Sequence, residues 1–187
     1  DGVAPLGIRW WGEGRIDRLL GYADATWQAM ADSGLSMVFM GAEAGSDDTL
    51  ARMDKGGRQS ADQVFALAER MATYGVVPEF SFVLGAPPDP AADVDRTLAF
   101  VRRVKAVNPA AEIILYLFTP EPVPGAMLTA ADEAGFAFPD TLDAWNGEPW
   151  RTRVQRRGPL PWIDERLLAR IRGFERVLHA YHPTSTD

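Results

Sequence analysis

The sequence predicts an α/β fold built on a parallel β-sheet and followed by a helical extension. Short apolar, β-prone runs alternate with amphipathic helical patterns about every 35 residues, the order that right-handed βαβ units require. Residues 37–40 are four bulky apolar residues in succession, which is typical of a parallel strand buried on both faces. After Met127 the alternation stops. We therefore expect residues 1–127 to form the α/β unit and residues 128–187 to form an extension packed on it.

The strands and helices of the α/β unit are predicted from local periodicity and from start and stop signals. Residues 6–11 (LGIRWW) form a β-prone run that Arg9 interrupts. Ser33-Gly34 would end the first helix, Ser46 can cap the second, and Asn108-Pro109 would end the fourth. The third helix shows apolar residues at i, i+3, i+4 and i+7: Val64, Leu67, Ala68 and Met71. We expect strands at 6–11, 35–41, 76–84 and 112–118, and helices at 24–31, 46–53, 60–74 and 89–107.

The extension is predicted to be mainly helical. Short helices are expected at 128–134 and 139–145, a loop-rich stretch at 145–161, and a final helix at 166–181. The final helix carries one apolar stripe: Leu167, Ile171, Phe174, Leu178 and Tyr181. This pattern indicates a cover packed against the sheet.

The composition limits the classes of function. The 187 residues include 19 Lys and Arg against 26 Asp and Glu, and the net charge of −7 argues against a general nucleic-acid binder. No apolar run approaches the roughly 20 residues of a membrane span, and no signal peptide is visible, so we expect a cytoplasmic protein. The sequence has no cysteine and therefore no thiolate metal ligand and no disulfide.

Glu43 is the main candidate for ligand binding. It follows the buried run 37–40 and lies between Gly41 and Gly45, where the strand should end. Ligands of parallel α/β proteins bind in the crevice beyond the carboxyl ends of the strands. The alternative is that Glu43 only accepts backbone hydrogen bonds in a tight turn. Glu43 and Lys55 offer an acid–base pair, but the motifs GxGxxG, GxSxG and HExxH are absent, and the residues by themselves do not identify a reaction.

Three ordered motifs carry a resemblance to a known family. They are residues 41–50 (GAEAGSDDTL), 53–56 (MDKG) and 82–87 (FVLGAP). In this order they resemble radical S-adenosylmethionine (radical SAM) enzymes, and within them the cobalamin-associated group of the anaerobic Mg-protoporphyrin monomethyl ester cyclase type. Residues 117–128 (LFTPEPVPGAML) are similar to the family's sixth-strand exit. The resemblance spans roughly residues 5–150.

The resemblance implies a partial (β/α) TIM-like barrel in which the four strands predicted here are the third to the sixth. It implies that the Glu43 carboxylate contacts the ribose hydroxyls of S-adenosylmethionine, because two neighbouring hydroxyls need a bidentate acceptor. Ser46 and Lys55 would approach the ribose and the methionine carboxylate, and Trp11 would help to line the cavity. The residues that the resemblance places against this cofactor are Glu43, Ser46, Lys55, Phe82, Leu84, Gly85, Phe118 and Arg9.

The chain lacks some features of the family and differs from it in sequence at others. The family's CxxxCxxC loop, which holds a 4Fe–4S cluster, follows its first strand, and this chain has no cysteine and no counterpart of the first two strands. Pro88-Asp89 stands where the family usually has Gly-Glu. The resemblance therefore implies the C-terminal part of a radical SAM enzyme that acts on a small molecule. The cluster, and cobalamin if it is used, would belong to the missing part, so this chain alone should be inactive.

Two other functions stay open at this level. One is a cysteine-free half-barrel that serves as a binding or interaction module. The other is a (β/α) barrel lyase or isomerase with Glu43 as the base, which would need further strands. Whatever the function, the first strand at 6–11 would be an exposed edge. We expect that edge to pair with a second copy or to be covered by the chain's own C-terminal segment.

Overall fold

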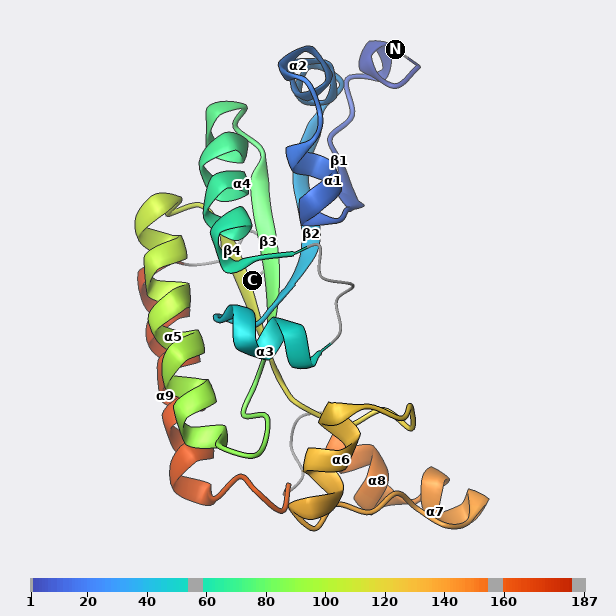
Figure 1. The fold of residues 1–187 in the computed structure, drawn as a ribbon. Coiled ribbons are helices and arrows are strands. Elements are labelled where there is room, and N and C mark those ends of the chain that lie inside the picture. Colours follow the sequence, from blue (N-terminus) through green and yellow to red (C-terminus); the bar gives the residue numbers. More distant parts are fainter. Residues whose placement is uncertain (1, 54–58, 155–159, 183–187) are drawn as a thin grey trace.

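The computed structural model describes residues 2–53, 59–154 and 160–182, and its centre is a four-stranded parallel sheet (Figure 1). The strands are β1 (Trp10–Glu13), β2 (Leu35–Glu43), β3 (Val77–Leu84) and β4 (Glu112–Leu117). Their order in the sheet is β1-β2-β3-β4, and each neighbouring pair is parallel. Because sequential strands are also spatial neighbours, the sheet has the connectivity of a partial β/α barrel. The predicted fold class is confirmed.

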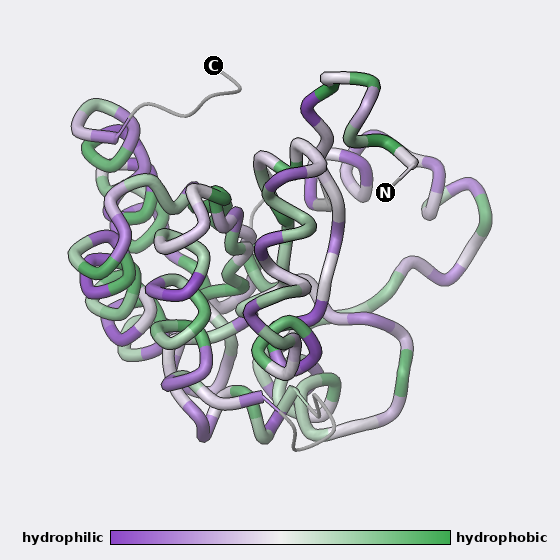
Figure 2. The backbone as a smooth tube through the Cα atoms, turned by 90° about the horizontal axis from the view of Figure 1, so that it is seen from above, coloured by the Kyte–Doolittle hydropathy of each residue, from purple (hydrophilic) through white to green (hydrophobic). Residues whose placement is uncertain are grey.

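Helices cover one face of this sheet. They are α1 (Ile16–Leu20), α2 (Asp24–Asp32), α4 (Ala61–Thr73), α5 (Pro90–Val107) and α9 (Glu165–Tyr181). Their apolar sides meet the sheet in one continuous core that includes Trp27, Met40, Phe80 and Val101, none of which has exposed surface. Figure 2 shows hydrophilic and hydrophobic residues alternating around the helical turns, as expected for helices with one buried side. None of the described helices is long and apolar enough to cross a membrane.

The helices that follow β4 lie in two different regions of the structure. The helices α6 (Ala126–Glu133), α7 (Leu142–Asn146) and α8 (Glu148–Val154) lie beyond the carboxyl ends of the strands, whereas α9 returns alongside α5 (Figure 1). A second apolar cluster joins this region to the strand ends through Ala86, Phe118 and Phe136. The Phe136 ring also contacts the rings of Trp150 and Trp162. The extension therefore borders the edge of the sheet where ligands of parallel α/β folds bind.

The prediction of a strand at 6–11 was wrong in its position. Pro5 lies in a short 3₁₀ helix at Ala4–Leu6, which Gly7 ends with a φ of +63°. Pro favours the first turn of a helix and Gly tolerates a left-handed φ, so this local preference overrides the β-propensity of the run. Strand pairing begins only at Trp10, and Arg9 is exposed before it. The edge strand at the N-terminal end of the sheet is consequently Trp10–Glu13, and β4 forms the other edge.

Two helices were not predicted. The short α1 (Ile16–Leu20) buries Ile16 and Leu19 against the core, in a stretch for which no element was predicted. The prediction of a loop-rich stretch at 145–161 was wrong for its first half, because α8 occupies Glu148–Val154. In α8 the hydroxyl of Thr152 donates to Glu148 Oε1 at 2.6 Å, a contact one helical turn apart that supports the helix.

Candidate functional site

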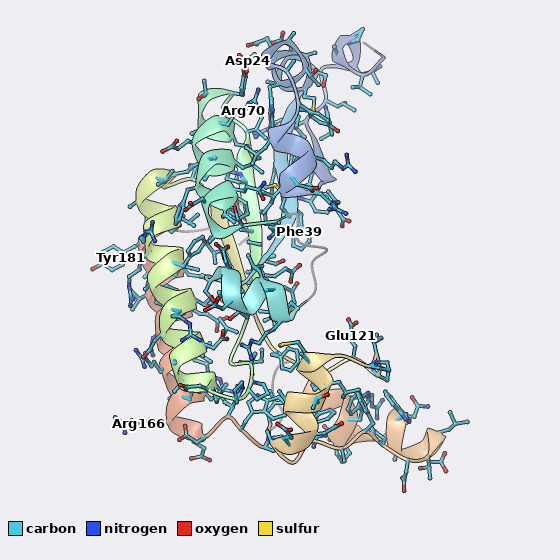
Figure 3. The ribbon with its side chains drawn as sticks, in the orientation of Figure 1. Asp24, Phe39, Arg70, Glu121, Arg166 and Tyr181 are labelled. Carbon is cyan, nitrogen blue, oxygen red and sulfur yellow. The ribbon has the colours of Figure 1, made fainter. Side chains whose placement is uncertain are left out.

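A cleft of about 880 Å³ opens at the carboxyl ends of β2, β3 and β4. Each of these strands contributes one lining residue at or next to its end: Glu43, Val83 and Phe118. Arg52 from α3 (Asp47–Arg52) and the segment that leads into α6 complete the wall. Figure 3 shows Glu121 in that segment, beside α6. The volume lies within the range of about 300–1,000 Å³ that is usual for small-molecule sites.

Glu43 ends β2 in an unusual backbone conformation. Its φ is +64°, which is uncommon for a residue with a side chain. The backbone N–H of Ala44 donates to the carbonyl of Ala42 at 2.8 Å, which closes a three-residue γ-turn with Glu43 at its centre. Such a conformation costs about 1–3 kcal/mol and persists only where the surrounding structure enforces it. Strained positions of this kind concentrate at functional sites.

The side chain of Glu43 folds back over Gly41. A Cβ placed on Gly41 would overlap Glu43 Oε1 and lie 3.1 Å from its Cδ, so the carboxylate occupies the space that a larger residue would need. Gln59 fixes the backbone of the two residues before Glu43, because its Nε2 donates to the carbonyls of Gly41 and Ala42 at 3.1 and 2.9 Å. The end of β2 is therefore built to present this one carboxylate in the cleft.

Of the residues predicted to contact the cofactor, Glu43 and Phe118 line the cleft, whereas Ser46 and Gly85 do not. Ser46 is the N-cap of α3, where its Oγ accepts from the N–H of Thr49 at 3.3 Å and donates to Thr49 Oγ1 at 3.0 Å. Gly85 follows β3 with a φ of +78°. Phe118 lines the cleft, and its ring lies 6.1 Å from that of Trp162. Lys55 lies outside the described residues.

Phe82, Leu84 and Arg9 are placed differently from the prediction. Phe82 and Leu84 have no exposed surface and lie in the core under the helices, where the Phe82 ring meets the Phe100 ring edge-on at 5.8 Å. Because side chains alternate along a strand, the neighbouring Val83 points to the other face and lines the cleft. Arg9 precedes β1 and is not among the cleft residues.

A second cluster of polar side chains lies on the sheet face opposite the helices. Trp11, half exposed, donates from Nε1 to Glu79 Oε2 at 3.3 Å, and Glu79 lies directly beside Glu112 of β4. Burial raises the pKa of Glu79 above its ordinary value, the Trp11 hydrogen bond opposes this, and the charge of Glu112 adds to it. Trp11 was predicted to line a cavity, and it lies on this open face.

Sequence reasoning missed Arg52 and Asp93. Arg52 lines the cleft and donates from Nη1 to the carbonyl of Pro87 at 2.8 Å. Asp93 is a buried carboxylate that accepts hydrogen bonds from Thr49, Gly85 and Ala86. A signal for Arg52 existed, since it ends the short helix that Ser46 caps and therefore stays close to the same strand ends. Asp93 gave no signal, because it looks like an ordinary acidic residue in the first turn of a helix.

No family model matches this chain, and no curated protein matches it either. In the described part of the chain, His, Asp and Glu side chains do not gather in groups of three that could hold a metal ion. The cleft brings together two carboxylate acceptors, Glu43 and Glu121, the guanidinium donor of Arg52 and an apolar wall. This arrangement suits a ligand that combines hydroxyl or ammonium groups, an anionic group and a flat apolar part.

Proposed function

We propose that this chain is the C-terminal part of the catalytic barrel of a radical SAM enzyme of the cobalamin-associated group, and that its cleft holds the adenosine part of S-adenosylmethionine. The observation that carries the proposal is the Glu43 carboxylate, which is held in a strained turn at the end of a parallel strand and lines a cleft. The partial-barrel connectivity and the ordered motifs around residues 41–56 and 82–87 support it.

The cleft residues fit this ligand. The Glu43 carboxylate would accept both ribose hydroxyls, Val83 and Phe118 would pack against the adenine, and the Arg52 guanidinium would bind the methionine carboxylate. When bound, S-adenosylmethionine supplies a sulfonium whose reductive cleavage starts radical chemistry. A 4Fe–4S cluster does not fit this chain, which has no cysteine. We therefore assign the cluster, and any cobalamin, to a part of the protein that precedes Asp1.

The test is the affinity of the chain for S-adenosylhomocysteine, measured by titration calorimetry. Glu43→Gln keeps the size of the side chain but removes its charge. It should raise the Kd about ten- to a hundredfold, because a hydrogen bond to a charged group contributes about 1.5–3 kcal/mol. The matched control is Asp48→Asn, since Asp48 is exposed on α3 and does not line the cleft. Equal affinities of Glu43→Gln and the unmodified chain, or no binding by the latter, would overturn the proposal.

A further inference from the structure

Asp93, in the first turn of α5, connects the loop after β3 with the helix α3. It is only 2% exposed. Its Oδ2 accepts from the backbone N–H groups of Gly85 and Ala86 at 2.8 and 3.2 Å, and its Oδ1 accepts from Thr49 Oγ1 at 3.2 Å. Arg96 lies near the same oxygen, at 4.0 Å. A buried carboxylate with three donors directed at it is strongly fixed, because charge-assisted hydrogen bonds are the stronger ones.

The partners of Asp93 do not line the cleft themselves, but they lie next to residues that do, Val83 of β3 and Arg52 of α3. Gly85 and Ala86 follow β3, whereas Thr49 lies in α3, one turn before Arg52. Arg52 then returns to the β3 loop through its hydrogen bond to the Pro87 carbonyl. The loop after β3, α3 and the start of α5 thus form one closed set of hydrogen bonds around the Arg52 side of the cleft.

The packing next to Asp93 leaves little freedom for these elements to shift. Gly45, which joins β2 to α3, lies directly against α5. A Cβ on Gly45 would be 2.8 Å from Phe100 Cβ and 2.9 Å from Thr97 Cα. The approach of α3 to α5 is therefore set by backbone contact on one side and by the Asp93 carboxylate on the other.

We propose that Asp93 is a positioning residue that fixes the β3 loop relative to α3 and thereby places the Arg52 guanidinium in the cleft. Asp93 touches no ligand and acts through Thr49, Gly85 and Ala86. The identity of the ligand rests on the proposed function, whereas the positioning does not. A carboxylate is required because all three partners are donors. An asparagine at this position would direct its N–H₂ group at one of these donors. If that donor were Thr49, the Thr49 hydroxyl would have to accept instead of donate, and the hydrogen bond between the Ser46 and Thr49 hydroxyls would have to change direction.

The first test needs no ligand. Asp93→Asn should speed the amide hydrogen exchange of Gly85 and Ala86 about tenfold or more, measured by NMR under native conditions. The matched control is Asp89→Asn, because Asp89 caps the same helix through the N–H of Ala92 and is exposed. It should leave both amides unchanged. Unchanged exchange in Asp93→Asn would overturn the inference. If this variant does not fold, Thr49→Val, which removes one of the three hydrogen bonds, should give the same pattern in a weaker form.

The second test measures coupling between Asp93 and Arg52. The Kd for S-adenosylhomocysteine is determined for Asp93→Asn, Arg52→Gln and the double variant. If Asp93 acts by placing Arg52, the loss caused by Arg52→Gln should be several-fold smaller in the Asp93→Asn background. Fully additive losses would contradict the positioning role. If the unmodified chain binds no S-adenosylhomocysteine but Asp93→Asn still exchanges faster at Gly85 and Ala86, the proposed function is refuted and the positioning of the loop is supported.

Discussion

Gly41→Ala separates the position of the Glu43 carboxylate from its charge. The substitution leaves Glu43 in the chain but places a methyl group where its carboxylate lies, overlapping Oε1. The carboxylate must then move by about 1 Å or more, which is enough to break a hydrogen bond of ordinary length. The loss of one charge-assisted hydrogen bond corresponds to about 1.5–3 kcal/mol, or a ten- to hundredfold rise in the Kd for S-adenosylhomocysteine.

The same substitution should hardly change stability. Ala in a strand is favoured over Gly by about 0.5–1 kcal/mol, and an off-rotamer Glu43 costs a similar amount. Titration calorimetry gives the Kd, and urea unfolding gives the stability. The control is Gly12→Ala in β1, where a Cβ would meet only the Trp10 ring at 3.5 Å. Unchanged affinity in Gly41→Ala would show that the position of Glu43 over Gly41 has no role in binding.

Two further predictions concern the sheet. Phe82→Ala should lower the free energy of unfolding by about 3–5 kcal/mol in urea titrations, because the ring has no exposed surface and packs on Phe100. Glu79→Gln should make stability less dependent on pH. Burial, opposed by the Trp11 hydrogen bond and reinforced by Glu112, raises the pKa of Glu79 in the folded state, so the folded chain binds the proton more tightly than the unfolded one. The free energy of unfolding therefore falls as the pH rises from the ordinary pKa of 4.5 through the raised pKa of Glu79. This decrease should be absent in Glu79→Gln.

Each of these predictions has an outcome that contradicts it. If Phe82→Ala costs less than about 1 kcal/mol, or weakens ligand binding while the variant is fully folded, the side chain belongs to the site and not to the core. For Glu79→Gln, urea unfolding is repeated from about pH 4 to about pH 7. A pH dependence equal to that of the unmodified chain would exclude Glu79 as its source, and Glu69→Gln on the exposed face of α4 serves as the control.

Much of the fold could be predicted because burial leaves a periodic trace in the sequence. Residues 37–40 and the helical spacing of Val64, Leu67, Ala68 and Met71 indicate their elements directly, and these four helix residues are all buried. The start of β1 could not be predicted from β-propensity, because the 3₁₀ helix around Pro5 takes the preceding residues. The helix α8 was missed because its short, polar sequence has no apolar stripe.

The candidate site could be predicted only in part. Glu43 was visible because its strand is apolar and glycines flank it, but its γ-turn depends on tertiary contacts such as those of Gln59. In residues 76–84, Phe80, Phe82 and Leu84 alternate with Glu79, Ser81 and Val83. This alternation could have placed Phe82 in the core and Val83 on the opposite face, whereas the family resemblance placed Phe82 against the cofactor. The contact between Thr49 and Asp93 joins residues 44 positions apart. Nothing in the local sequence signals such a pair.

The most direct measurement is the nucleotide sequence that precedes the codon for Asp1. If this chain is the C-terminal part of a radical SAM enzyme, the reading frame continues upstream. It should encode a CxxxCxxC loop after a strand-like run, within the roughly 100 residues that two further βα units need. An upstream cobalamin-binding domain would place the enzyme in the cobalamin-associated group. An upstream stop codon, or a continued frame without the three cysteines, would contradict the assignment and leave Glu43 in a binding module that has no cluster.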